Sequence, residues 1–186
     1  CTRCPEMTGP PVIGQPALSK VMLIGQAPGS RELEQRRPFA WTAGRTLFKW
    51  FGSIGLEEEA FRKRVYMAAV CRCYPGKKDK GGDRVPYPGE VDNCSSWMQA
   101  EFELLRPALI IPAGKLAIGR FLEFDRLSDV IGYKHRVRVA GHKTDLIPLP
   151  HPSGASTWHQ TEPGKSLLAQ ALQLIGETPS WRKLVR

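Results

Sequence analysis

The sequence predicts an α/β fold in which helices cover both faces of a small, mainly parallel sheet. Three short apolar runs support this prediction: Val21–Ile24, Val65–Val70 and Ala108–Ile111. A segment with helical spacing comes after each run, as parallel strands require, because they are joined by crossover connections. Runs that are apolar throughout, instead of at alternate positions, indicate strands buried on both sides. Ligands of such folds bind at the carboxyl ends of the strands.

The first half of the chain begins with a loop and continues with alternating strands and helices. Residues 1–18 hold a Cys-x-x-Cys and several prolines, which predicts a tethered loop. After the first strand, residues 43–54 place large apolar side chains at helical spacing, and we interpret them as core. Glu57–Arg64 runs from acidic to basic residues, which suits the dipole of a short helix. The second strand follows directly.

The second half of the chain starts with a loop. Residues 74–88 are rich in proline, glycine and lysine and must lie at the surface. Pro88 suits the first turn of a helix that runs to about Leu105, and Arg106-Pro107 ends it. Beyond the third strand we expect a helix over residues 116–122, a hairpin over 134–149 and a last amphipathic helix over 167–175.

Composition limits the class of protein. The chain has 186 residues, of which 41% are hydrophobic, so we expect a single domain over residues 1–186 with its own core. No apolar run approaches the roughly 20 residues that cross a bilayer. No secretion leader is evident, so we expect a cytoplasmic protein without a membrane partner. The net charge of +9 favours a polyanionic partner, most often nucleic acid.

The cysteines indicate metal binding. Their number is five, and an odd number without a leader argues against a disulfide framework. Cys1 and Cys4 place two thiols on one short loop, and Cys73 and Cys94 bracket the surface loop that follows the second strand. Four thiolates suit an iron–sulfur cluster or a structural zinc ion, and spacing alone does not separate the two.

Two motifs fall at the carboxyl ends of predicted strands. Gly25-Gln-Ala-Pro-Gly29 directly follows the first strand, and its glycines let a ligand approach the backbone closely. His151 and Ser153 follow the last strand, and the flanking Pro150 and Pro152 stiffen the backbone of the histidine. A turn of the first kind and a lone histidine are each common in purely structural roles, so only the pair indicates a site.

Together, the two motifs resemble those of the uracil-DNA glycosylase superfamily. Arg37-Pro38-Phe39 and Ala43-Gly44-x-x-Leu47 are similar to a stretch found in its iron–sulfur branch, which is the family 4-like branch. The segment from Val65 to Cys73, followed by Cys94 on the next helix, also resembles that branch, as does the segment from Arg106 to Gly114. The resemblance extends over nearly the whole chain.

This resemblance implies a three-layer α/β/α sandwich and a reaction. The reaction is hydrolysis of the N-glycosidic bond of a deaminated base, uracil in the first place, that is flipped out of DNA and leaves an abasic site. The resemblance further implies a monomer that acts on nucleoid DNA in a bacterial or archaeal cytoplasm. It favours a structural [4Fe-4S] cluster over zinc, with Cys1, Cys4, Cys73 and Cys94 as ligands. Cys71 is the spare thiol, although a shift of two residues would exchange it with Cys73.

The resemblance also implies roles in the reaction. Phe39 occupies the position of an aromatic wall that stacks on the base. His151 would donate a hydrogen bond to the carbonyl oxygen of the leaving base, and backbone amides near Gln26 and Ala27 would add donors. The most familiar branch orients the attacking water with an aspartate at the position of Ala27. Here Glu32 is the nearest carboxylate for that role.

One departure from the family concerns the choice of base. The superfamily usually carries an asparagine near the end of the second strand, where its amide pairs with uracil, and Ala68-Ala69 stand there in this chain. Because buried hydrogen bonds supply most discrimination between similar bases, strict selectivity for uracil is not expected. Hypoxanthine or xanthine is then an alternative substrate. The remaining substrate contacts we expect are Gly25, Ala27, Ala69 and Ser153.

The loop over residues 74–88 points to DNA contacts. A related branch traps its substrate through a histidine in a basic insert, and this loop is basic without a histidine, which argues against such a trap. Its cations are expected to touch phosphates instead. The expected DNA contacts are Lys77, Lys78, Lys80, Arg84 and Ser156.

Two further classes of protein remain open. Alanines at positions 27 and 69 would also suit a catalytically weak protein of the same fold that binds DNA damage. The third class is a zinc-stapled nucleic-acid-binding module unrelated to glycosylases. Brown colour would exclude that class, and loss of turnover on mutation of His151 and Glu32 would distinguish an enzyme from a binder.

Overall fold

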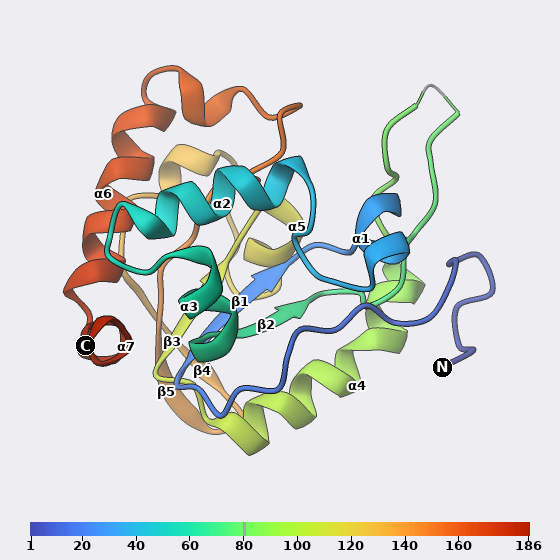
Figure 1. Cartoon of the computed structure of the whole chain (residues 1–186), viewed down its shortest axis with the longest axis horizontal. Coiled ribbons are helices and arrows are strands. Elements are labelled where there is room, and N and C mark those ends of the chain that lie inside the picture. Colours follow the sequence, from blue (N-terminus) through green and yellow to red (C-terminus); the bar gives the residue numbers. More distant parts are fainter. Residues whose placement is uncertain (80) are drawn as a thin grey trace.

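A five-stranded sheet runs through the centre of the computed structural model, which describes residues 1–79 and 81–186 (Figure 1). Its order is β2-β1-β3-β5-β4, and the pairs β1·β2, β1·β3 and β3·β5 are parallel, whereas β4 is antiparallel to β5. The strands are β1 (Val21–Gly25), β2 (Tyr66–Ala69), β3 (Leu109–Pro112), β4 (His135–Val139) and β5 (His142–Leu146). The mainly parallel sheet confirms the predicted fold class.

The helices cover both faces of this sheet, with α2 and α6 on one side and α4 on the other (Figure 1). They are α1 (Ser30–Gln35), α2 (Thr42–Gly52), α3 (Glu58–Arg64), α4 (Pro88–Leu105), α5 (Lys115–Ile118), α6 (Gly164–Glu177) and α7 (Pro179–Val185). Two short 3₁₀ turns span Leu127–Asp129 and Trp158–Gln160.

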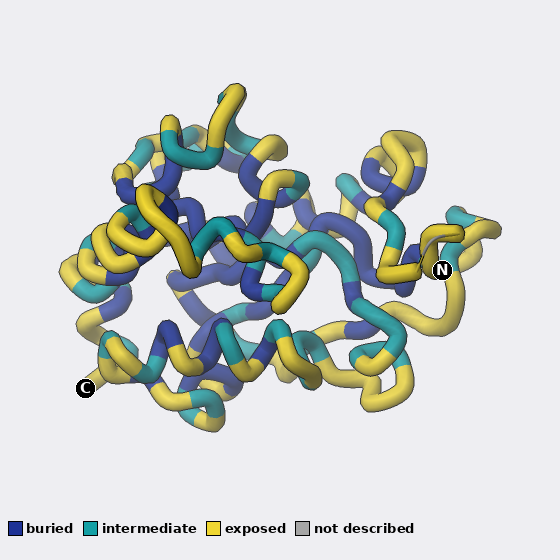
Figure 2. The backbone as a smooth tube through the Cα atoms, turned by 90° about the horizontal axis from the view of Figure 1, so that it is seen from above, coloured by how far each residue is buried: buried dark blue, intermediate teal, exposed yellow. Residues whose placement is uncertain are grey.

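Strand β1 explains the three layers. Successive side chains of a strand point to opposite faces, so Val21 and Leu23 join the core beneath α2, α3, α6 and α7, whereas Met22 and Ile24 join the core against α4. All five residues of β1 are buried. The uniformly apolar run is therefore what a central strand with two covered faces requires. Figure 2 shows this buried centre with exposed segments around it.

Several boundaries differ from the sequence expectations. Helix α4 has the predicted bounds, but the helix expected over 116–122 is the single turn α5, followed by turns in which the amides of Phe121 and Leu122 both bond the carbonyl of Ile118. Helix α7 was not predicted from the sequence. It is held by Trp181, which is buried and donates from Nε1 to the carbonyl of Ile54 at 3.0 Å.

The N-terminal segment and the 74–88 loop project on the side of the molecule that carries α1 (Figure 1). Both lack long regular elements, as predicted, and they are tied to each other. The amide of Thr8 donates to the carbonyl of Tyr74 at 2.8 Å, and the amide of Val12 donates to the carbonyl of Arg72 at 2.7 Å. Within the part of the chain that the structure describes, no helix has the length and apolarity to cross a membrane.

Candidate active site

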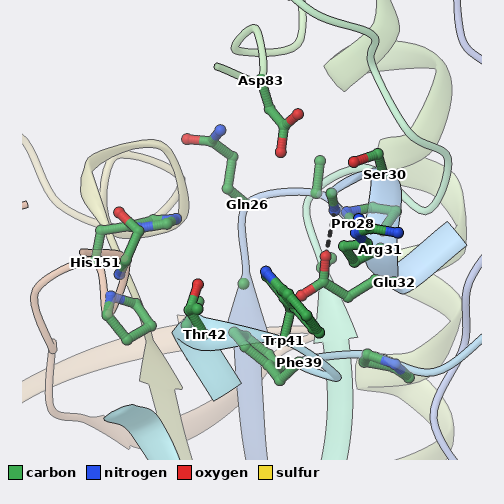
Figure 3. Close-up of a pocket in the computed structure, with 18 of the residues that line it drawn as sticks. Gln26, Pro28, Ser30, Arg31, Glu32, Phe39, Trp41, Thr42, Asp83 and His151 are labelled. Carbon is green, nitrogen blue, oxygen red and sulfur yellow. Dashed lines mark hydrogen bonds between the residues drawn. The ribbon is translucent and has the colours of Figure 1, made fainter. Parts of the chain in front are cut away.

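A cavity of about 750 Å³ opens at the carboxyl ends of β1, β2 and β3 (Figure 3). Its walls include Gly25–Glu32 after β1, Ala68 and Ala69 at the end of β2, and His151 on the loop after β5. The two sequence motifs therefore meet in one pocket, at the edge of the sheet where α/β folds bind ligands.

Phe39 forms an aromatic wall of this cavity. Its ring lies against the backbone of Gly25, where a Cβ would come within 2.9 Å of the ring Cζ. Strand β1 can therefore end directly beneath the ring only because residue 25 has no side chain. Phe39 also adopts a left-handed backbone conformation, with φ of 52°, which is strained for a bulky residue and needs support from its surroundings.

That support comes from Arg62 of α3, which sequence reasoning missed. The residue is 4% exposed, and its side chain donates from Nη1 to the carbonyl of Pro38 at 2.8 Å and from Nη2 to the carbonyl of Phe39 at 3.0 Å. Glu58 accepts from its Nε at 2.8 Å, which supplies a counter-charge. Burial lowers the pKa of Arg62, and the hydrogen bond to Glu58 opposes that change. A buried guanidinium thus fixes the backbone that carries the aromatic wall.

His151 lies on the opposite wall, against Gly114 at the end of β3. A Cβ at Gly114 would lie 2.9 Å from the imidazole Cδ2, so a side chain there would collide with the ring. Gly114 also has a φ of 90°, a backbone conformation that favours glycine. The amide of Ser153 donates to Nδ1 at 3.3 Å, which leaves the proton of a neutral ring on Nε2. Burial lowers the pKa of His151. The ring is therefore a neutral donor held in one tautomer.

Glu32 lies at the start of α1 and caps that helix. Its Oε2 accepts from the amide of Gly29 at 2.9 Å (Figure 3). Asp83, from the 74–88 loop, lies on the other side of Gly29 from Glu32. The phenol of Tyr74 donates to Oδ1 of Asp83 at 3.0 Å. Asp83 has no local sequence signal, because a charged residue is ordinary in a charged loop. Only the folded loop brings it to the pocket.

The wall of the cavity at the end of β2 carries small side chains. Ala68 and Ala69 line the cavity there and offer no side-chain donor or acceptor. Among the described residues that line the cavity, Gln26 carries the only side-chain amide, and it lies between His151 and Asp83 in Figure 3. Its backbone carbonyl accepts from the amide of Cys71 at 3.0 Å, which ties the first motif to the end of β2.

The expected DNA contacts are distributed unevenly. Lys77 and Lys78 are exposed, and Lys78 lines the mouth of the cavity. Arg84 is instead paired with Glu90, at 2.6 and 2.7 Å, and so anchors the loop to α4. The amide of Ser156 donates to the carbonyl of Ser153 at 3.0 Å and closes a turn. Ser156 is not among the residues that line the cavity. Lys80 lies outside the described residues.

Trp41 is a third residue that sequence reasoning missed, after Arg62 and Asp83. It is 48% exposed at the mouth of the cavity, with the guanidinium of Arg31 5.3 Å and that of Arg45 5.9 Å from its ring centre. An aromatic face beside two cations is suited to a nucleobase and its phosphates. One feature of the sequence could have indicated it. Trp41 stands just before the amphipathic pattern of α2, so this large aromatic side chain is not part of the core-facing stripe of that helix.

The cysteines gather on the side of the N-terminal segment. Cys71, Cys73 and Cys94 are buried, and Asn93 donates to the thiol of Cys4 at 3.7 Å. Burial raises the pKa of Cys73, the neighbouring Cys94 and Cys4 raise it further, and the amino group of Cys1 lowers it. These effects indicate that the thiols of Cys4, Cys73 and Cys94 and the amino terminus lie in the same region of the molecule. The spare Cys71 is also near this group, because the neighbouring Cys94 raises the pKa of its thiol.

The donor set suits a thiolate-bound metal in its chemistry. Its arrangement is looser than that of a formed site, since no group of three histidine, cysteine or acidic side chains in residues 1–79 and 81–186 is close enough to hold a metal ion. Cys73 and Cys94 are buried and Cys4 is partly buried, whereas Cys1 is exposed at the start of the chain.

Comparison with known proteins agrees with this geometry. A model of the uracil DNA glycosylase superfamily matches residues 11–175. The type-4 uracil-DNA glycosylase of Archaeoglobus fulgidus is 31% identical over 140 residues, which is 73% of this chain and 66% of the relative, just under two thirds of its length. The type-4 enzyme of Pyrobaculum aerophilum is 29% identical over 162 residues, which is 82% of this chain and 78% of the relative.

A third relative is the type-4 uracil-DNA glycosylase of Thermotoga maritima, 28% identical over 156 residues, 82% of this chain and 76% of the relative. These matches confirm the resemblance drawn from the motifs, and they set aside an unrelated zinc-stapled module. The match over residues 11–175 shows that this chain belongs to the uracil DNA glycosylase superfamily.

Proposed function

We propose that this chain is a DNA repair glycosylase that hydrolyses the N-glycosidic bond of uracil flipped out of DNA and leaves an abasic site. The observation that carries the proposal is a single cavity with Phe39, His151 and Glu32 on its walls. The three type-4 uracil-DNA glycosylases that resemble the chain over most of its length support it. A base must leave the duplex stack to reach such a pocket.

The flipped base stacks on the face of Phe39. Aromatic stacking holds the ring without selecting one base, and Arg62 keeps the wall in place through the carbonyls of Pro38 and Phe39. When the glycosidic bond breaks, its electron pair stays on the base as negative charge. The Nε2 proton of His151 bonds the carbonyl oxygen where that charge collects, and backbone amides near Gln26 and Ala27 add to this stabilisation.

Water then attacks the sugar carbon on the other side of the broken bond. Glu32 is the carboxylate of the first motif that orients this water and offsets the positive charge of the sugar. Its fixed position is supported by the bond that its Oε2 accepts from the amide of Gly29.

The bare wall at Ala68 and Ala69 favours a second candidate substrate. Without an amide there, a larger purine such as hypoxanthine or xanthine meets no side chain that rejects it. The reaction class is the same for either base. A damage-binding protein without turnover is the remaining alternative on this fold.

A cleavage assay tests the proposal. Purified protein is incubated with end-labelled DNA that carries one uracil, hypoxanthine or xanthine, and abasic sites are then revealed by alkaline strand breakage. We expect breakage at uracil and none at thymine in a matched strand. Breakage only at another base would preserve the reaction class and overturn the substrate. Binding to damaged DNA without any breakage would favour the damage-binding protein.

The partner is DNA, and the chain acts on it as a monomer at the nucleoid of a bacterial or archaeal cytoplasm. The net charge of +9 and the exposed cations at the mouth of the cavity support contacts with phosphates. Lys77, Lys78, Arg84 and Ser156 stay our proposed contacts, and Trp41 beside Arg31 and Arg45 adds a stacking face.

Cys1, Cys4, Cys73 and Cys94 are the residues that would hold a [4Fe-4S] cluster, with zinc as the alternative. When bound, the group supplies no redox step and acts as a staple between the N-terminal segment, the end of β2 and α4. The effects of Cys4 and Cys94 on the pKa of Cys73 support the assignment of these three ligands.

Two serine variants test which cysteine belongs to the set. We expect the purified protein to be brown and to contain iron, Cys73→Ser to lose both iron and colour, and Cys71→Ser to keep both. Iron analysis and visible absorption spectra measure this. The reverse pattern would make Cys71 the ligand, and a colourless protein that contains zinc would replace the cluster by zinc.

A further inference from the structure

The 74–88 loop brings a second carboxylate to the cavity. Asp83 lines the mouth of the pocket and is exposed in the free protein. The roles described above for the base, its leaving charge and Glu32 do not use it. A base that enters the cavity leaves its sugar at the mouth, so a carboxylate there faces the reacting carbon and not the base.

The position of Asp83 is fixed on two sides. The loop closes beneath it through a bridge between Lys77 and Asp83 and a bond of 2.9 Å from the amide of Arg84 to the carbonyl of Gly76. Its Oδ1 accepts from the phenol of Tyr74, which is 7% exposed and therefore well anchored. The loop thus presents one carboxylate oxygen, Oδ2, to the cavity.

Asp83 and Glu32 face each other across Gly29. A Cβ on Gly29 would lie 2.6 Å from Oε2 of Glu32 and 2.8 Å from Oδ2 of Asp83. Figure 3 shows the side chains of Asp83 and Glu32 approaching the segment after β1 from opposite sides. Two carboxylates so close can accept both protons of one water molecule, which then presents its lone pairs outward.

We propose that Asp83 is a catalytic residue that, together with Glu32, binds the attacking water. The proposal rests on the glycosylase activity proposed above. It adds a second carboxylate, beside Glu32, to the site that binds the attacking water. It also explains how the pocket works with alanine at position 27, because a loop carboxylate takes the place of one in the first motif.

The step balances as a hydrolysis. The bond between C1′ and the base nitrogen breaks, and its electron pair leaves on the base. The water oxygen forms a bond to C1′, and one water proton passes to the carboxylate of Asp83, which releases it to solvent. The base anion, hydrogen-bonded to His151, takes up a proton from solvent. Both carboxylates stabilise the positive charge of the sugar while the bonds exchange.

The test compares two substitutions in one loop. Asp83→Asn keeps an oxygen that accepts from Tyr74 but removes the charge, and Asp79→Asn makes the same change at an exposed residue outside the cavity lining. With saturating uracil DNA, we expect the single-turnover rate of Asp83→Asn to fall about 100-fold or more. Asp79→Asn is expected to match the unchanged protein. Affinity for DNA that contains an abasic site should stay equal or become tighter, because a negative charge near phosphates is lost.

Other outcomes have distinct meanings. A rate of Asp83→Asn equal to that of Asp79→Asn overturns the inference while the glycosylase remains. So does a fall in rate that only follows a fall in DNA affinity, since the loop would then merely position DNA. No cleavage by the unchanged protein overturns the proposed function and this inference with it. A double substitution with Glu32→Gln should cost less than the two separate effects combined, because both residues hold one water.

Discussion

His151→Ala is expected to lower the single-turnover rate of uracil release about 100- to 1000-fold, the usual cost of removing one donor to a developing negative charge. The amide of Ser153 holds the imidazole as a neutral ring with its proton on Nε2, and burial lowers its pKa, so the donor is present throughout the neutral range. The alanine variant retains Phe39 and the exposed cations. Its affinity for DNA with an abasic site should therefore be unchanged.

Two control variants make this result specific. His142→Ala removes a histidine of β5 outside the cavity lining and should leave the rate unaltered. His151→Gln restores an N–H donor on a side chain of similar reach and should recover part of the lost rate. If His151→Ala cleaves as fast as His142→Ala, the leaving charge is stabilised by other groups and the role assigned to the imidazole is wrong. Thermal unfolding of each variant checks that the fold is retained.

Gly44→Ala is expected to damage both stability and the aromatic wall. A Cβ on Gly44 would overlap the carbonyl of Phe39, an atom that Arg62 holds in place. Either the first turn of α2 shifts or Phe39 moves, and overpacking of this kind costs about 1–3 kcal/mol of unfolding free energy or more. For a chain of this size each kcal/mol lowers the Tm by about 2–4 °C. The affinity for damaged DNA should fall as well, because the displaced ring no longer matches the base.

Gly89→Ala is the matched control for this change. Gly89 lies in the first turn of α4, where a Cβ meets nothing within 4 Å, so alanine there should leave the Tm equal or raise it slightly. Calorimetry of both variants and DNA titrations give the two readouts. A Gly44→Ala variant as stable as Gly89→Ala would mean that the contact between α2 and Phe39 is easily relaxed, and that the wall is not fixed by packing.

The sequence predicted those parts of the structure that depend on local pattern. Helix α4 has its predicted bounds because Pro88 starts it and Arg106-Pro107 ends it. The two motifs meet because the carboxyl ends of parallel strands share one edge of the sheet. Arg62, Trp41 and Asp83 were missed because each acquires its role from a part of the chain that is distant in sequence or from the folded pocket: the Phe39 backbone, the cavity mouth and Glu32 across Gly29.

The two sides of the cavity differ in how they are supported. Phe39 and His151 rest on α3 and on the end of β3, which belong to the buried centre, whereas Asp83 rests on a loop tied to the N-terminal segment and to α4. Hydrogen exchange in the loop can therefore proceed through local opening while the sheet remains protected. In the proposed mechanism, stacking of the base depends on the rigid side of the cavity and attack by water depends on the loop side, so we expect opening of the loop to slow cleavage more than it weakens DNA binding.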